Sequence, residues 1–141
     1  MMKRWLPAPR DVVYDAFVDP NQIAKWFGPD GFNVRSVVFV PHVGSCYRIA
    51  LQPPVGEPFH VAGAVCQLEP SHSLEFTFVY EEPSADDVET RVSLSFADRG
   101  PDESEVGLTQ GMFKTEERCA LHETGWSDSL DKLQRVVTDA A

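Results

Sequence analysis

The chain lacks the cysteine content and spacing that a disulfide framework or a zinc site would need. Its three cysteines, Cys46, Cys66 and Cys119, are odd in number and widely spaced. No Cys-x-x-Cys pair occurs, and no histidine or cysteine stands at zinc-finger spacing. We therefore expect free thiols, no metal site and a reducing, cytoplasmic location.

Long apolar runs and an excess of positive charge are also missing. No stretch approaches the ~20 apolar residues of a membrane span, and no apolar signal segment follows Lys3 and Arg4. Lysine and arginine number 12 against 22 acidic residues, which gives a net charge of -10 and a pI of about 4.7. An acidic chain repels phosphate backbones and anionic membrane surfaces, so we expect neither nucleic acid nor membrane insertion.

The familiar catalytic and cofactor motifs are absent as well. The sequence contains no Gly-x-Ser-x-Gly, no Walker A segment, no His-Glu-x-x-His and no Gly-x-Gly-x-x-Gly loop. The acidic pairs Glu81-Glu82 and Asp86-Asp87 lie in a segment with turn residues, where solvated charges are the usual outcome. We expect no cofactor and identify no catalytic residue beyond His122 as a weak candidate.

What the chain does have is a long amphipathic last helix. Trp126, Leu130, Leu133 and Val137 are spaced four, three and four, which places one apolar stripe on one face of a helix. His122 lies four residues before Trp126 and falls on the same stripe. Either this stripe only plugs a curved sheet, or sheet and helix enclose a pocket whose wall includes His122 and Trp126.

The rest of the chain predicts a sheet that this helix would cover. Asp19-Pro20 is typical of a helix start, with a capping aspartate and proline in the first turn. We expect strands near residues 1–6, 32–40, 46–51, 59–69, 74–80, 91–96 and 106–112, short helices at 9–17 and 19–27, and a last helix capped by Thr115. Residues 1–141 then form one α+β domain, with six antiparallel strands in a meander.

An ordered set of short segments along nearly the whole chain carries a family resemblance. They are residues 7–13 (PAPRDVV), 14–20 (YDAFVDP), 26–29 (WFGP), Gly63 before Glu69-Pro70, 74–78 (LEFTF), and Gly125-Trp126 with Leu130 and Leu133. Together they resemble the activator of heat-shock protein 90 ATPase homologue-like family of the START-like (SRPBCC) helix-grip superfamily. That resemblance implies a curved antiparallel sheet of about six to seven strands that grips a long C-terminal helix, with two short helices after the first strand. It implies ligand binding more firmly than any reaction.

Our leading hypothesis is a domain that binds a small hydrophobic or aromatic molecule between sheet and helix. Aromatic side chains and isolated polar groups share the faces that are expected to point inward. The residues expected to line the cavity are Trp26, Phe76, Phe78, Tyr80, Gln110, Met112, His122 and Trp126. For the tryptophans the alternative is core packing, and for His122 it is a buried imidazole paired with a carbonyl or a tyrosine.

Two other functions stay open. Some helix-grip relatives are cyclases, dehydratases or hydrolases, and the resemblance would then make His122 the acid–base group with Tyr80 or Gln110 polarising a carbonyl. A co-chaperone role is suggested by the family name, but no docking motif is present and we expect no chaperone partner.

The sequence also leaves open whether two copies of the chain form a homodimer. The basis for a homodimer is the outer sheet face, which carries Val37, Phe39 and Val79 unless a one-residue bulge reverses the assignment.

Overall fold

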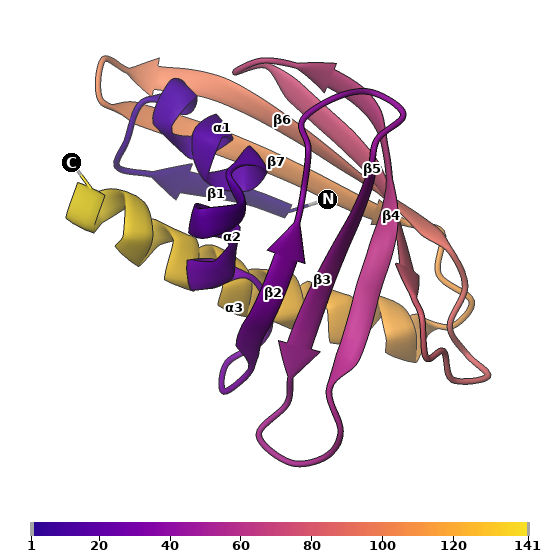
Figure 1. Ribbon diagram of the computed structural model, residues 1–141. Coiled ribbons are helices and arrows are strands. Elements are labelled where there is room, and N and C mark those ends of the chain that lie inside the picture. The colour runs from indigo at the N-terminus through magenta and orange to yellow at the C-terminus, as the bar shows by residue number, and fades with distance from the viewer. Residues whose placement is uncertain (1, 141) are drawn as a thin grey trace.

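One antiparallel sheet and three helices make up residues 2–140, the part of the chain that the computed structural model describes (Figure 1). The strands are β1 (Met2–Leu6), β2 (Asn33–Val38), β3 (Cys46–Gln52), β4 (Phe59–Glu69), β5 (Ser73–Tyr80), β6 (Thr90–Gly100) and β7 (Glu103–Gly111), and the helices are α1 (Arg10–Val18), α2 (Pro20–Trp26) and α3 (Glu116–Ala140). The sheet order β1-β7-β6-β5-β4-β3-β2 is a six-strand meander with β1 added beyond β7. The predicted α+β helix-grip architecture is confirmed.

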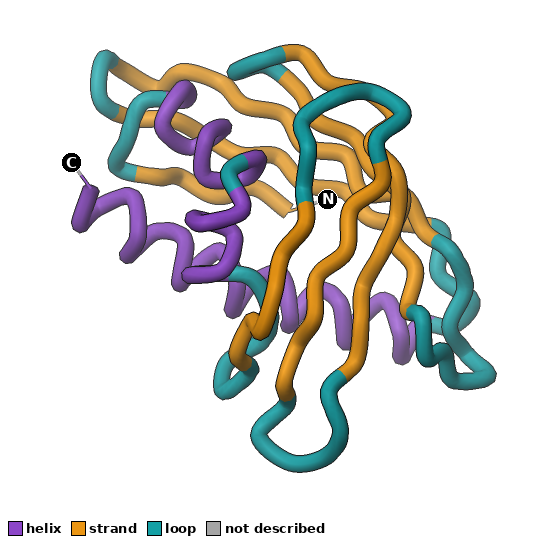
Figure 2. The backbone as a smooth tube through the Cα atoms, in the orientation of Figure 1, coloured by secondary structure: helices purple, strands orange, loops and turns teal. Residues whose placement is uncertain are grey.

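Helix α3 lies across the curved sheet, as the tube in Figure 2 makes clear. Its predicted apolar stripe is buried throughout, with Trp126, Leu130, Leu133 and Val137 each at most 5% exposed. At its start the Thr115 hydroxyl accepts a hydrogen bond from the Arg118 N–H at 3.1 Å, as an N-cap does. Burial of this stripe is what holds the helix on the sheet.

The two short helices fill one end of the space between sheet and α3. Helix α2 begins at Pro20, and the Asp19 side chain accepts from the Asn21 N–H at 2.9 Å, which confirms the predicted cap. Helix α2 contacts both β2 and α3. At its end Trp26 is 2% exposed and donates its indole N–H to the Ala16 carbonyl at 3.0 Å, which joins the two short helices.

Gly63 in β4 is required by a close approach of its neighbours rather than by a turn. The Tyr47 side chain passes over it, and the Tyr47 hydroxyl donates to the Thr77 carbonyl at 2.7 Å. A Cβ on Gly63 would lie 1.9 Å from the Thr77 oxygen, so no larger residue fits. The bulge that bends this strand lies just beyond, between Val65 and Gln67.

A second bulge corrects the expected outer face of the sheet. The β2–β3 register shifts between Val34 and Ser36, which reverses the facing of the residues that follow. Val37 therefore packs against the core, and Phe39 is buried with its ring centroid 5.8 Å from that of Tyr47. Placing Val37 and Phe39 on the outer face was wrong, so these two residues give no support to a homodimer.

The sequence predicts free thiols and no membrane-spanning helix. Cys46, Cys66 and Cys119 are free thiols in the structure. Within residues 2–140, no helix combines the length and the apolar character needed to cross a membrane.

Candidate functional site

A pocket of about 280 Å³ lies between α3 and the concave side of the sheet. Its walls come from the segment that follows α2, from β3, β4 and β5, and from α3. The residues that line it are Phe27, Gly28, Pro29, Phe32, Leu51, Pro53, Phe59, Val61, Phe78, Tyr80, Arg118, Leu121, His122, Gly125, Trp126 and Ser129. Most of these side chains are apolar, which is the usual composition of a small-molecule pocket.

Helix α3 contributes two adjacent rows of side chains to this pocket. Arg118, His122 and Trp126 form one row at four-residue spacing, and Leu121, Gly125 and Ser129 form the next. Residues four apart lie one above the other on a helix, so both rows run along the pocket. At Gly125 only a hydrogen atom separates the helix backbone from the pocket.

The polar end of the pocket is built on a tyrosine–histidine pair. The Tyr80 hydroxyl lies 2.8 Å from His122 Nε2, and His122 Nδ1 lies 2.8 Å from the Arg118 carbonyl oxygen. The imidazole packs between Phe78 and Phe113, with ring-centroid distances of 5.7 and 4.8 Å. Burial lowers the pKa of His122 and raises the pKa of Tyr80 to about 12, so both groups are neutral at neutral pH.

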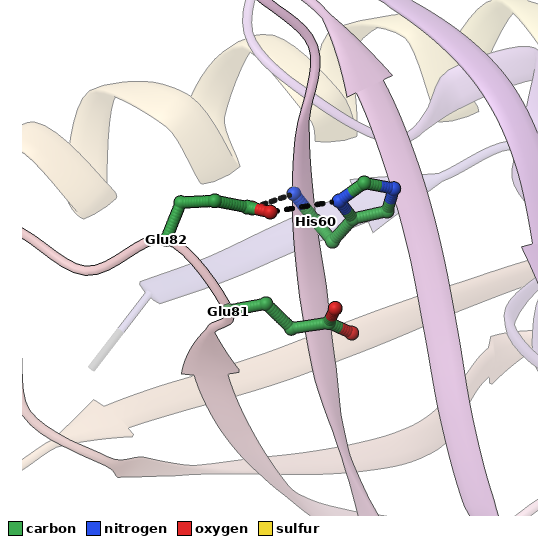
Figure 3. Close-up of side chains that lie close together, drawn as sticks. All are labelled: His60, Glu81 and Glu82. Atoms are coloured by element: carbon green, nitrogen blue, oxygen red, sulfur yellow. Dashed lines mark hydrogen bonds and ion pairs between the residues drawn. The ribbon is translucent and has the colours of Figure 1, made fainter.

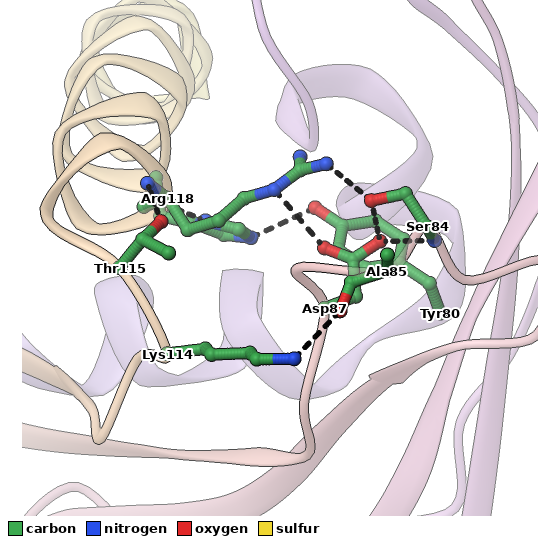
Figure 4. A network of polar contacts seen from close by, with 8 residues as sticks. Tyr80, Ser84, Ala85, Asp87, Lys114, Thr115 and Arg118 are labelled. Atoms are coloured by element: carbon green, nitrogen blue, oxygen red, sulfur yellow. Dashed lines mark hydrogen bonds and ion pairs between the residues drawn. The ribbon is translucent and has the colours of Figure 1, made fainter.

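A network of polar contacts lies next to the Tyr80–His122 pair (Figure 4). Arg118 forms an ion pair with Asp87 at 3.5 Å and hydrogen-bonds the Ser84 hydroxyl. Asp87 also accepts from the Ser84 N–H at 2.8 Å, and Lys114 Nζ donates to the Ala85 carbonyl at 3.0 Å. These contacts tie the segment between β5 and β6 to the start of α3.

At the other end, the segment after α2 is held to α3 through Ser129. The Ser129 hydroxyl accepts from the Gly28 N–H at 3.0 Å and lies 2.9 Å from the Gly125 carbonyl oxygen, to which it can donate. Lys132 Nζ adds a contact of 3.3 Å to the Pro29 carbonyl. The pocket wall formed by residues 27–32 is therefore fixed by hydrogen bonds to the helix.

Four of the eight residues expected to line a cavity are placed together in this pocket: Phe78, Tyr80, His122 and Trp126. Trp126 donates its indole N–H to the Gln110 side-chain oxygen at 2.8 Å. The arrangement of His122 corresponds to the alternative of an imidazole paired with a carbonyl and a tyrosine, but in the wall of a pocket.

The other four expected residues lie elsewhere. Trp26 and Phe76 belong to the packed core at the α1–α2 end. Gln110 is held between Trp126 and Thr90, to whose hydroxyl it donates at 2.8 Å, so its amide is engaged within the protein. Met112 is 87% exposed because β7 ends at Gly111 and its alternation goes no further.

Several pocket residues were not anticipated from the sequence. Phe59 and Val61 share one face of β4, and Leu51 continues the inward face of Tyr47 and Ile49 on β3, so strand alternation could have indicated them. Ser129 and Leu121 flank the apolar stripe of α3 at four-residue spacing from Gly125. Sequence patterns indicate which residues point inward. They do not show whether such a residue borders the pocket or fills the core, because that depends on packing.

Three polar side chains outside the pocket lie close together: His60, Glu81 and Glu82 (Figure 3). One possible metal-ligand atom of each lies within 4.8 Å of the other two. Glu82 accepts from the His60 backbone N–H at 2.7 Å and lies 2.9 Å from His60 Nδ1. Glu81 receives two hydrogen bonds from the Arg48 guanidinium, at 2.7 and 2.9 Å. Hydrogen bonds from Arg48 and His60 hold the pKa of Glu81 and Glu82, respectively, below the usual value. The carboxylate oxygens and His60 Nδ1 are therefore already engaged within the protein, and the Arg48 side chain is 55% exposed.

Comparisons with known proteins agree with this fold over nearly the whole chain. A family model described as Activator of Hsp90 ATPase homolog 1-like protein matches residues 7–138. No curated protein sequence matches this chain. Among solved structures, a protein from Chromobacterium violaceum is 27% identical with a TM-score of 0.80, covering 96% of this chain and 94% of that one. The AHSA1 protein from Silicibacter pomeroyi is 20% identical with a TM-score of 0.84, covering 99% and 97%.

Proposed function

We propose that this chain, which belongs to the Activator of Hsp90 ATPase homolog 1-like family, binds a small hydrophobic or aromatic molecule between α3 and the sheet. The observation that carries the proposal is the pocket of about 280 Å³ with its mostly apolar wall. Apolar surface that a ligand covers there contributes about 25 cal/mol per Å² to binding. The pocket volume lies near the lower end of the range for ligand sites, about 300–1,000 Å³.

The fixed walls of the pocket support the same proposal. Hydrogen bonds hold residues 28–29 to α3 at one end, and the Arg118 network holds the segment 84–87 at the other. A pocket that is already formed spares a ligand the entropy of ordering loops. The few polar groups in its wall would orient the ligand.

The proposal can be tested with the fluorescent probe N-phenyl-1-naphthylamine, whose emission rises in apolar surroundings. Gly125→Leu places a side chain into the pocket from α3, where a Cβ meets only Pro29 at 3.6 Å. Leucine favours a helix over glycine by slightly less than the ~1 kcal/mol that separates alanine from glycine, so the substitution does not weaken α3 itself. Ala120→Leu on the exposed part of the same helix is the matched control.

We expect the unmodified chain and Ala120→Leu to bind the probe alike, and Gly125→Leu to bind at least ~10-fold more weakly because the pocket is filled. Equal affinity in all three proteins would place the probe outside the pocket. No binding to any of them would count against ligand binding by this class of molecule.

The Tyr80–His122 hydrogen bond of 2.8 Å favours a second candidate function, an enzyme of the cyclase, dehydratase or hydrolase type with His122 as acid–base group. Aryl esters such as 1-naphthyl acetate provide a simple assay through the released naphthol. Hydrolysis that disappears in His122→Gln, while far-UV circular dichroism is unchanged, would support it. Equal rates in both proteins would remove His122 from such a mechanism.

A further inference from the structure

The proton positions of the Tyr80–His122 pair follow from a single fixed contact. His122 Nδ1 lies 2.8 Å from the Arg118 carbonyl oxygen, and a carbonyl oxygen can only accept. Nδ1 therefore carries the proton, and in the neutral imidazole Nε2 is an acceptor. Since Nε2 lies 2.8 Å from the Tyr80 hydroxyl, Tyr80 must donate its O–H to the histidine.

This direction leaves the Tyr80 oxygen as a hydrogen-bond acceptor. Its only hydrogen points to His122, so the lone pairs are what it can offer to a ligand. Within residues 2–140, the Tyr80 hydroxyl makes only this hydrogen bond, in which it donates, so no donor of the protein reaches its oxygen. A buried hydroxyl oxygen without a donor gains from one that a ligand supplies.

The charges around the pair disfavour an anionic ligand. Asp87 contributes a largely buried carboxylate. Among the described residues that line the pocket, Arg118 is the only lysine or arginine, and it is already paired with Asp87 and with the Ser84 hydroxyl. An added carboxylate would compete with Asp87 for the same guanidinium. The net charge of -10 acts in the same direction.

We infer that the ligand is a neutral molecule with a hydroxyl donor, a phenol or an alcohol, that binds with its O–H on Tyr80 and its apolar body against the aromatic wall. This inference rests on the proposed function of the same pocket. The hydroxyl would meet the acceptor that the Arg118–His122–Tyr80 chain creates. An ether, which only accepts, would leave that oxygen unpaired.

The test compares 2-naphthol with 2-methoxynaphthalene, which has the same rings and no donor. The ratio of their dissociation constants is measured by calorimetry near pH 7, where phenols, with pKa values of about 10, stay neutral. The same ratio is measured in the variant Tyr80→Phe/His122→Leu, which removes both acceptors, and in the control Tyr14→Phe, whose tyrosine lies in the core outside the pocket.

We expect the relative preference for 2-naphthol to fall by about 2- to 10-fold in the double variant and to stay unchanged in Tyr14→Phe. The same ratio in all proteins would overturn the inference, while binding of both compounds that Gly125→Leu abolishes would leave the proposed function intact. Failure of both compounds to bind the unmodified chain would overturn both.

A measurement on the unmodified chain covers the case in which the double variant does not fold. Imidazole nitrogen NMR shifts distinguish a protonated from a bare ring nitrogen. We expect His122 to carry its proton on Nδ1, with Nε2 bare and shifted when 2-naphthol binds next to Tyr80. A proton on Nε2 of the neutral ring would make Tyr80 a donor toward the ligand and would overturn the inference.

Discussion

Replacing Trp26 by phenylalanine tests whether this side chain belongs to the core or to the proposed ligand site. Trp26 is 2% exposed and donates to the Ala16 carbonyl at 3.0 Å. Loss of that bond leaves a buried carbonyl unpaired, at about 1–3 kcal/mol. The smaller ring leaves roughly 40 Å³ unfilled, which at ~24 cal/mol per Å³ adds about 1 kcal/mol.

The expected loss is therefore about 2–4 kcal/mol in the free energy of unfolding, measured by urea denaturation with far-UV circular dichroism. At about 4 °C per kcal/mol for a domain of this size, the melting temperature should fall by about 8–16 °C. The affinity for N-phenyl-1-naphthylamine should change by less than ~2-fold, because Trp26 does not line the pocket.

The chain offers two matched controls for the same substitution. Trp5 is 47% exposed and donates to Glu103 at the surface, so Trp5→Phe should change the unfolding free energy by no more than about 0.5 kcal/mol. Trp126 lines the pocket and donates to Gln110, so Trp126→Phe should lower both stability and probe affinity. A Trp26→Phe variant as stable as Trp5→Phe, or one that loses probe affinity like Trp126→Phe, would refute this assignment.

Three further predictions concern single contacts. Gly63→Ala should prevent folding or lower stability by more than about 4 kcal/mol, seen as a loss of cooperative thermal unfolding, because its Cβ would lie 1.9 Å from the Thr77 oxygen. Ser129→Ala should cost about 1–3 kcal/mol in urea unfolding, since the Gly28 N–H loses its acceptor; a smaller effect would mean that water replaces the hydroxyl. Burial lowers the folded pKa of His122 below the ordinary imidazole value of 6.5, so its contribution to stability is fully present above pH 6.5 and is lost as pH falls toward the folded pKa. The urea midpoint should accordingly drop less between about pH 7 and pH 5 in His122→Gln than in the unmodified chain, and an equal drop would contradict this.

Secondary structure was predictable because each element carries its own local signal. Alternating residues in β5, the Asp19-Pro20 start of α2 and the four-three-four stripe of α3 each agree with the observed element. The failures occur where a local irregularity changes which face a residue lies on. The bulge at Val34–Ser36 turned Phe39 inward, and the end of β7 at Gly111 left Met112 in solvent.

The site was only half predictable for a different reason. In a helix-grip fold the core and the pocket share one apolar face, so periodicity places a side chain inside without saying which of the two it borders. Phe76 and Phe78 lie on the same face of β5, yet Phe76 packs toward Tyr47 while Phe78 borders the pocket beside His122. The difference arises because α1 and α2 fill one end of the curved sheet and stop short of the other.

The proposed preference for a hydroxyl ligand depends on a still finer feature, the direction of one hydrogen bond. A tyrosine next to a histidine is compatible with either donor direction, and the sequence lists the two residues 42 positions apart. The direction is set by the Arg118 carbonyl, a backbone atom on the preceding turn of α3, which no side-chain pattern reports. Any residue at position 118 would supply that carbonyl, so Arg118→Gln should weaken the tie to Asp87 yet leave the His122 tautomer unchanged in imidazole nitrogen NMR spectra. A tautomer that moved with this substitution would show that the side-chain charge, and not the backbone, orients the pair.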